Sequence, residues 1–519
     1  MASGVKEREA DRGDYTLLRE NAVTAGRGIS YLTLQTFATL AAQTIVFSIL
    51  VRLVSVAQIG LLAIMVTTLA AEQVIVNLGL GPIISQVIAE NLAQEKKTIA
   101  ATTFYLSFLL NASVSVVVAA VILVTGFPAG ISGLSSSGVI SKISIFLALD
   151  AVVNYNYITG ATFFGLQKFR DLALLGTSLA LTSQAVIVAL VFASRSVVGW
   201  AAATVIMDLV YTIVMFSYLI KRLGRPVFDF GPKKLLKLSA PLYLSNLCSF
   251  AYNWFDRLFV IGFANVTAVA LYGVATQVFG AYLSLISVLP NVLIPAFATS
   301  HGAGGRASLS QATRSSSRYV SYAAFPIAFA LLATAKPVIS LFAGVQYEGA
   351  VFPLAELVAF STAAVLASTF TSALIVLRET GLYAVTVIVP LIASITVAFL
   401  TISSLGIVAA STARGLAMVL NLVLSLMLVQ KKLSVTPDVK SVGKSFISGV
   451  ALGLVTYLCQ VVWYNRLLLP VYLLCGGLAY VFSMRILGAV SDHDIDLIRD
   501  ILGPRFVTVV KLLSYMLVP

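Results

Sequence analysis

Two charged residues lie side by side in the middle of the otherwise apolar stretch CSFAYNWFDRLFVIGF, where Asp256 precedes Arg257. A carboxylate can take up a proton or a cation, and a guanidinium can hold two phosphate oxygens through its fork of N–H donors. In lipid, each such charge costs about 2.5–3.5 kcal/mol near the centre of a helix, so charged residues there usually face a protein interior or a watery cavity. In a membrane protein, the pair would therefore mark the inner wall of a helix.

Other apolar runs also contain ionisable side chains that could do chemistry. The arginines of these runs whose guanidinium groups could hold an anion are Arg52, Arg257 and Arg414. The candidates for ion coupling, or for lining a polar cavity, are Glu72, Asp150, Asp208, Asp256 and Asn253. The alternative interpretation is that these groups form hydrogen bonds or ion pairs between helices and have no role in transport.

The composition decides which solvent surrounds these residues. The 519 residues are 59% hydrophobic and only 11% charged, with a mean hydropathy of +0.98, whereas soluble proteins carry about 25% charged residues. Apolar runs of about 20 residues are long enough to cross a membrane, and the sequence contains about fourteen of them. We therefore predict an all-α polytopic membrane protein with about fourteen transmembrane helices.

The arrangement of these runs predicts two six-helix lobes related as repeats, because RLVSVAQIGLLAIMV and FANVTAVALYGVATQV fall at equivalent helix junctions. Two further helices follow the second lobe. The predicted segments are a cytoplasmic N-terminal tail (1–27), an N-lobe (28–220), a cytoplasmic connector (221–235), a C-lobe (236–430), two added helices (443–488) and an interfacial cytoplasmic tail (489–519). Gly449 and Gly453 form a GxxxG motif, which favours helix packing within the chain or in a dimer.

The basic residues fall mainly on alternate connections, and this asymmetry predicts that both termini are cytoplasmic in a multi-pass protein of the plasma membrane. The formal net charge of +13 is then a signal of topology, and we expect no nucleic-acid partner.

The connections between the apolar runs are too short to hold a catalytic or nucleotide-binding domain. We expect no enzyme activity, no catalytic residue and no cofactor. The two histidines and three cysteines show no metal-ligand spacing, so no metal site is predicted.

Three quoted stretches resemble the polysaccharide flippases, often called Wzx-type, of the multidrug/oligosaccharidyl-lipid/polysaccharide (MOP) exporter superfamily. They are VRLVSVAQIGLLAI, NLGLGPIISQVIAE, and PLYLSNLCSFAYNWFDRLFVIGF followed by ALYGVA. The resemblance extends over nearly all of the first twelve predicted helices. One departure is Asn77, where many members have an aspartate.

The resemblance implies that the protein flips an isoprenyl-phosphate- or diphosphate-linked oligosaccharide from the cytoplasmic to the outer leaflet by alternating access. In such a flippase, Arg52, Arg257 and Arg414 would bind the phosphate headgroup of the substrate. The expected partners are this lipid-linked substrate, membrane lipids and, as an open question, a coupling cation, either H⁺ or Na⁺. Two alternatives remain. One is a cation-coupled multidrug exporter of the same superfamily, and the other is a membrane scaffold for glycan assembly that transports nothing.

Overall fold

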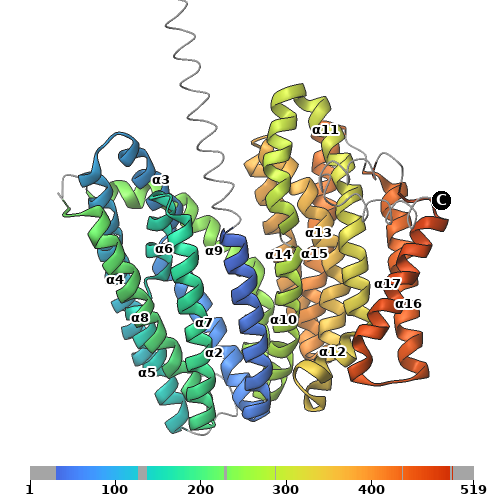
Figure 1. Cartoon of the computed structure of the whole chain (residues 1–519), viewed down its shortest axis with the longest axis horizontal. Coiled ribbons are helices and arrows are strands. Elements are labelled where there is room, and N and C mark those ends of the chain that lie inside the picture. Colours follow the sequence, from blue (N-terminus) through green and yellow to red (C-terminus); the bar gives the residue numbers. More distant parts are fainter. Residues whose placement is uncertain are drawn as a thin grey trace, which may run out of the picture. The chain divides into compact units, whose positions relative to one another are not determined.

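The computed structural model describes residues 31–126, 137–226, 231–286, 288–434, 437–490 and residue 494. Within these ranges the chain is helical and contains no β-strand (Figure 1). Most of the predicted tails at 1–27 and 489–519 lie outside the described residues. The chain divides into two compact units, Met1–Phe250 and Ala251–Pro519, and the division falls inside a single helix, α9.

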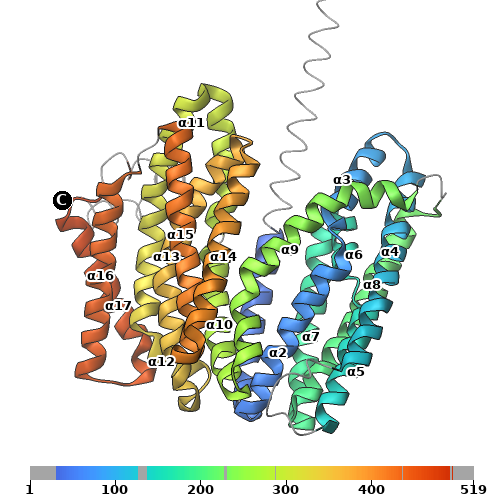
Figure 2. The same ribbon diagram turned by 180° about the vertical axis from the view of Figure 1, so that it is seen from behind.

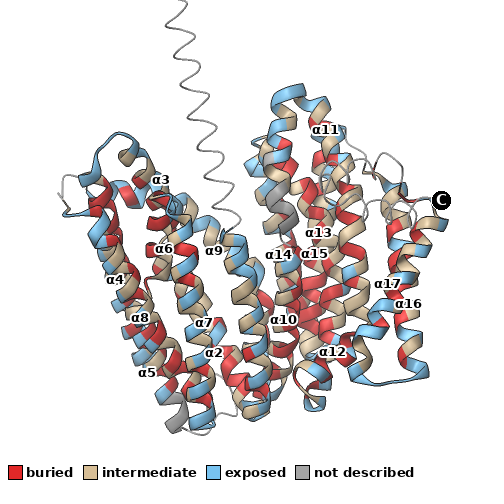
Figure 3. Cartoon of the chain, in the orientation of Figure 1, coloured by how far each residue is buried: buried red, intermediate tan, exposed pale blue. Residues whose placement is uncertain are grey.

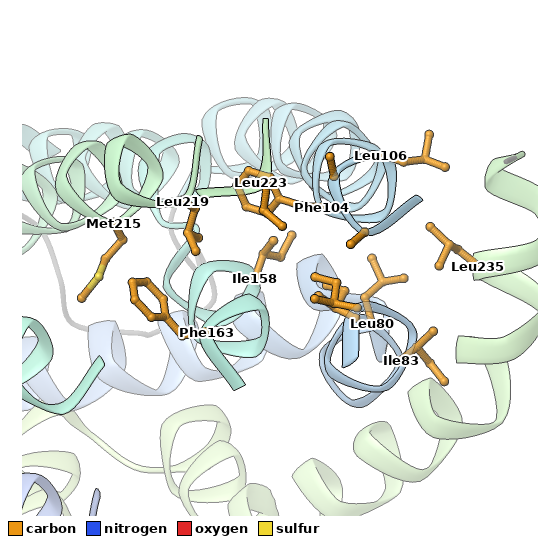
Figure 4. Packing of buried hydrophobic residues seen from close by; sticks show 14 of the residues in the cluster. Leu80, Ile83, Phe104, Leu106, Ile158, Phe163, Met215, Leu219, Leu223 and Leu235 are labelled. Atoms are coloured by element: carbon orange, nitrogen blue, oxygen red, sulfur yellow. The ribbon is translucent and has the colours of Figure 1, made fainter. Parts of the chain in front are cut away.

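Unit 1 contains a first helix and then α2 to α8, followed by the beginning of α9. The bounds are Tyr31–Leu53 for the first helix, α2 Val56–Asn77, α3 Leu80–Ala93, α4 Lys97–Thr125, α5 Ser137–Val153, α6 Asn156–Gly165, α7 Phe169–Ser194, α8 Val197–Leu223 and α9 Pro232–Phe263. A core at one end of the unit joins α3, α4, α6, α7, α8 and the beginning of α9. Its buried side chains include Leu80, Phe104, Ile158, Phe163 and Leu219 (Figure 4).

Two connections in unit 1 join successive helices through short breaks in the helical backbone. Between α2 and α3 the backbone turns left-handed at Leu78 (φ 49°) and Gly79 (φ 67°), which glycine adopts without strain. Between α5 and α6 the side chain of Thr212 bridges the gap, since its Oγ1 donates to the Val153 carbonyl oxygen (2.7 Å) and accepts from the Tyr155 amide (3.3 Å). Such a side-chain bridge satisfies the backbone groups that the break frees in an apolar environment.

Unit 2 contains the rest of α9 and all later elements. Their bounds are α10 Val266–Ile286, α11 Val288–Ala333, α12 Ala335–Phe342, η1 Val345–Ala350, α13 Val351–Val376, α14 Thr380–Leu405, α15 Ile407–Leu433, α16 Val439–Val462, η2 Arg466–Leu468 and α17 Leu469–Ile486. The backbone of α11 leaves the helical region at Gly304 and Gly305, and the axis bends by 68° between α11 and α12. One core of this unit includes Phe297, Phe370 and Val429.

Eleven described helices are long and apolar enough to span a membrane, and the bent pair α11–α12 makes a twelfth. The two other predicted spans correspond to α5 with α6, which are individually short, and to α9, which carries several charges. The prediction of an all-α polytopic fold is thus confirmed, and about fourteen spans agree with the structure. Large apolar side chains such as Leu109, Val117 and Leu474 are exposed, as expected for surfaces in contact with lipid. Exposed residues recur along the helices of both units (Figure 3).

The GxxxG motif packs within the chain. A Cβ atom added to Gly449 on α16 would lie 2.5 Å from the ring of Phe329 on α11, and one added to Gly453 would lie 3.5 Å from the same ring. The small residues therefore let α16 approach α11 closely, as one of the two predicted roles of the motif requires.

Candidate functional site

Asp256 is the centre of a buried polar cluster in unit 2. Its residue exposure is 2%, and it lies on α9 opposite α10 and α15. Its Oδ1 accepts from Arg414 Nη1 at 3.2 Å, and its Oδ2 accepts from the hydroxyl of Tyr272 at 2.7 Å. Both carboxylate oxygens are thus paired, so the negative charge of Asp256 is compensated inside the protein.

The guanidinium of Arg414 also binds the backbone of α9. Its Nη1 donates to the carbonyl oxygens of Tyr252 (3.1 Å) and Asn253 (2.8 Å) in addition to Asp256. Arg414 is buried, with 8% of its surface exposed. It therefore ties α15 to the middle of α9 and keeps the Asp256 carboxylate in place.

Arg257 has a different environment from Arg414. Its Cζ atom lies 4.3 Å from the centre of the Trp254 ring, a cation–π contact. Its Nη2 is 3.5 Å from the carbonyl oxygen of Thr276, which is a long hydrogen bond. The described ion pairs include none between Arg257 and a carboxylate. Because Arg414 already pairs with Asp256, Arg257 adds a second guanidinium beside this ion pair.

A second carboxylate lies near this cluster in unit 2 and was not among the residues predicted from the sequence. Glu356 on α13 accepts hydrogen bonds from the hydroxyls of Ser411 and Thr412 on α15, the latter at 3.0 Å. These hydroxyls lie about one helical turn before Arg414. The available signal was a single acidic residue in the apolar run of 351–376, the same signal that singled out Glu72. Tyr272 was missed because a tyrosine in an apolar helix is unremarkable until its partner is known.

A second polar cluster lies in unit 1, at the break between α5 and α6. Asp208 on α8 accepts from the side-chain amides of Asn154 (3.1 Å) and Asn156 (2.9 Å). The amide of Asn154 also lies 3.4 Å from an oxygen of Asp150. The break thus brings two asparagine amides to two carboxyl groups that lie on different helices.

Glu72 on α2 completes this cluster, because it interacts electrostatically with Asp208 and Asp150. Glu72 and Asp150 are 3% and 2% exposed. Glu72 Oε2, Asp150 Oδ1 and Asn156 Oδ1 are buried without a hydrogen-bond partner among the described residues. No ion pair of the described chain involves these acids. Buried carboxyls without a basic partner are stable when they hold a proton or a cation.

The structure therefore brings the predicted residues together in two groups. Glu72, Asp150 and Asp208 meet in unit 1, while Asp256, Arg257 and Arg414 meet in unit 2. Asn253 contributes its carbonyl oxygen to Arg414, and its side chain is exposed.

Arg52 is exposed near the end of the helix Tyr31–Leu53. That it binds the same ligand as Arg257 and Arg414 stays a prediction. Within the described ranges no group of three His, Cys, Asp or Glu residues could hold a metal ion.

Comparison with known proteins identifies a family. A family model described as polysaccharide biosynthesis protein matches residues 49–352, more than half of the chain. This match confirms the resemblance inferred from the sequence. The chain matches no curated protein sequence.

Among solved structures, the chain is similar to the lipid II flippase MurJ in an inward closed conformation. The TM-score is 0.65 at 15% identity, over 91% of this chain and 100% of that chain. An inward-facing multidrug resistance MATE family transporter of the MOP superfamily matches with a TM-score of 0.58 at 15% identity, over 78% of this chain and 98% of that chain.

A MOP superfamily transporter from Pyrococcus furiosus, described as having a binding pocket of reverse polarity, matches with a TM-score of 0.52 at 17% identity. The match covers 78% of this chain and 95% of that chain. At these identities the similarity establishes the fold.

Proposed function

The chain belongs to the polysaccharide biosynthesis protein family, and from this premise we propose that it flips an oligosaccharide linked to an isoprenyl phosphate or diphosphate. The substrate would move from the cytoplasmic to the outer leaflet of the plasma membrane, with both termini of the chain cytoplasmic. The similarity of the fold to a lipid II flippase supports this choice. Surface polysaccharide or glycoprotein biosynthesis would consume the product.

The observation that carries the proposal is the arrangement around Arg257. A phosphate headgroup must cross hydrocarbon, so it needs a cation that is not already neutralised. Arg414 and Tyr272 occupy both oxygens of Asp256, which leaves the guanidinium of Arg257 to provide positive charge beside the Trp254 ring. A guanidinium can hold a phosphate through two parallel hydrogen bonds, while the lipid tail stays in the bilayer.

Arg414 and Arg52 complete the proposed phosphate ligands in different ways. Arg414 is bound to α9, so we expect it to act chiefly by holding Asp256 and thereby the helix that carries Arg257. Arg52 is exposed at the end of its helix and would meet the headgroup at an early or late stage of transfer.

The carboxyls of unit 1 would supply the energy coupling. Glu72, Asp150 and Asp208 lack a basic partner in the described chain, and two of their oxygens are buried and unpaired. Binding of H⁺ or Na⁺ would neutralise them, and release would restore repulsion between them. Alternating access then requires that the two charge states of this cluster favour different conformations.

The decisive experiment measures transbilayer movement of a labelled isoprenyl-diphosphate-linked oligosaccharide in proteoliposomes. We expect Arg257→Ala to slow this movement by about 10- to 100-fold, since a charge-assisted hydrogen bond contributes roughly 1.5–3 kcal/mol. The matched control is Arg195→Ala, which removes another arginine stacked on an aromatic ring, that of Phe192 at 4.5 Å. Equal rates for both variants and wild type would contradict a phosphate path along α9.

The second candidate function is cation-coupled export of organic cations, and the acidic cluster of unit 1 favours it. Such an exporter would take up an organic cation against an imposed H⁺ or Na⁺ gradient, and Arg257→Ala would leave this uptake intact. A scaffold that transports nothing would show neither activity.

A further inference from the structure

The beginning of α9 is seated firmly on unit 1. Its first turns run across the end of the unit near α3 before the helix changes direction (Figure 2). Leu235 and Ser239 on this segment are 0% and 1% exposed. A Cβ atom added to Gly79 would lie 2.6 Å from the backbone nitrogen of Tyr243 and 2.9 Å from the carbonyl oxygen of Ser239. This contact between backbones fixes which face of α9 points away from the unit.

The opposite face of this segment is basic. At 100° per residue, Lys233, Lys234 and Lys237 occupy the arc opposite Leu235 and Ser239, and all three lysines are exposed. Leu236 (37% exposed) and Leu238 (46% exposed) lie between the buried and basic arcs. A helix with a lysine face and exposed leucines beside it is typical of a segment that lies in a membrane interface.

Neighbouring connections extend the positive charge. The α3–α4, α6–α7 and α8–α9 connections lie at the same end of unit 1 (Figure 1). Their exposed basic residues are Lys96, Lys97, Lys168, Arg170, Lys221, Arg222 and Arg225. The described acidic residues of these connections and the adjoining helix ends are Glu90, Glu95 and Asp171. We call these basic residues, together with the three lysines of α9, the basic surface.

We propose that the basic surface binds the headgroups of anionic phospholipids. Each lysine near an anionic membrane gains electrostatic free energy, and the lysine stems can lie along apolar surface while their ammonium groups reach phosphate. The exposed leucines beside the lysines favour a lipid surface over an acidic soluble partner, because they can enter the boundary between headgroups and acyl chains. This role is separate from the proposed transport site, since none of its residues belongs to either polar cluster.

The test uses the full chain in phosphatidylcholine vesicles that contain no transport substrate. Spin-labelled phosphatidylglycerol and spin-labelled phosphatidylcholine report how strongly each lipid associates with the protein. We expect wild type to prefer phosphatidylglycerol, and we expect the preference to fall when the ionic strength rises from 0.01 M to 1 M, where the screening length drops from about 30 Å to about 3 Å. Lys233→Gln/Lys237→Gln should weaken the preference by about fivefold for each lysine removed.

The matched control is Lys431→Gln/Lys440→Gln, which removes the same charge from exposed lysines of unit 2. It should keep the wild-type preference. An unchanged preference in Lys233→Gln/Lys237→Gln, or an equal loss in both double variants, would overturn the proposal. So would association of a spin-labelled isoprenyl phosphate without any preference for phosphatidylglycerol, because that result would assign the surface to capture of the transport substrate. Thermal unfolding of each variant checks that the fold is kept.

Discussion

The guanidinium of Arg414 lies 3.2 Å from Oδ1 of Asp256, and this ion pair joins α15 to α9 inside unit 2. The side chains of both residues are buried, at 10% and 2% exposure. Taking either partner away would leave the charge of the other unpaired in an apolar interior, whereas taking both away would remove both charges of the pair.

We therefore predict that Arg414→Met destabilises the protein by about 3–5 kcal/mol, the usual cost of breaking a buried pair. The double variant Arg414→Met/Asp256→Asn should recover part of that loss, because the remaining amide carries no charge. Unfolding in detergent for wild type, both single variants and the double variant gives the coupling free energy. Additive effects of the two substitutions would contradict the ion pair as the cause.

For the carboxyls of unit 1, we predict that a substitution leaves the protein as stable as wild type or makes it more stable. Asp150→Asn removes a carboxylate that has a buried oxygen without a partner, so the free energy of unfolding should stay equal or rise by up to about 2 kcal/mol. The neutral amide resembles the protonated carboxyl and cannot release a proton. Transport driven by an ion gradient should then fail, although the fold is kept.

Glu90→Gln is the control for this variant, because Glu90 is an exposed carboxylate of the same unit. It should change neither stability nor the dependence of transport on the gradient. Gradient-driven transport at the wild-type rate in Asp150→Asn would exclude Asp150 as a coupling residue.

Gly449 and Gly453 provide a matched pair on α16. Gly449→Ala places a Cβ atom 2.5 Å from the Phe329 ring, and we expect a loss of about 1–3 kcal/mol from this overpacking. Gly453→Ala places its Cβ atom at an ordinary contact distance of 3.5 Å, and alanine favours a helix by up to about 1 kcal/mol. In thermal unfolding, Gly453→Ala should have the higher unfolding temperature of the two variants. A higher unfolding temperature for Gly449→Ala would refute close packing against α11.

Asp494, which follows α17 in the sequence, is bound to α11. Its Oδ1 accepts from Arg318 Nη2 at 2.5 Å and from the hydroxyl of Tyr319 at 2.8 Å, and the residue is 3% exposed. Asp494→Asn should cost about 1–3 kcal/mol and speed hydrogen exchange of the amides just after α17.

Glu379→Gln is the comparison for Asp494→Asn. It breaks the ion pair between Glu379 and Lys432. The side chains of these two residues are 32% and 40% exposed, so the loss should lower the free energy of unfolding by at most about 1 kcal/mol. Equal effects of the two substitutions would mean that burial of Asp494 adds nothing to stability.

The apolar runs of the sequence predicted most of the fold, and the isolated charges within them identified most of the residues of both polar clusters. A charge in an apolar run is visible without any tertiary information, and this signal identified Glu72, Asp150, Asp208, Asp256 and Arg414. The same reasoning could not find Tyr272, whose importance depends on a partner sixteen residues away on another helix. Nor could it separate Arg257 from Arg414, because both are single arginines in apolar helices.

The sequence by itself determined that the chain is a polytopic helical membrane protein, because the length and hydropathy of a spanning helix are set by the bilayer and need no partner. Only the tertiary structure decided which charges compensate one another. Asp256 is paired by Arg414 from α15, more than 150 residues along the chain, whereas Asp150 and Glu72 meet other acids. Helical periodicity gives the face of a residue, but the identity of the facing helix depends on how all the helices pack.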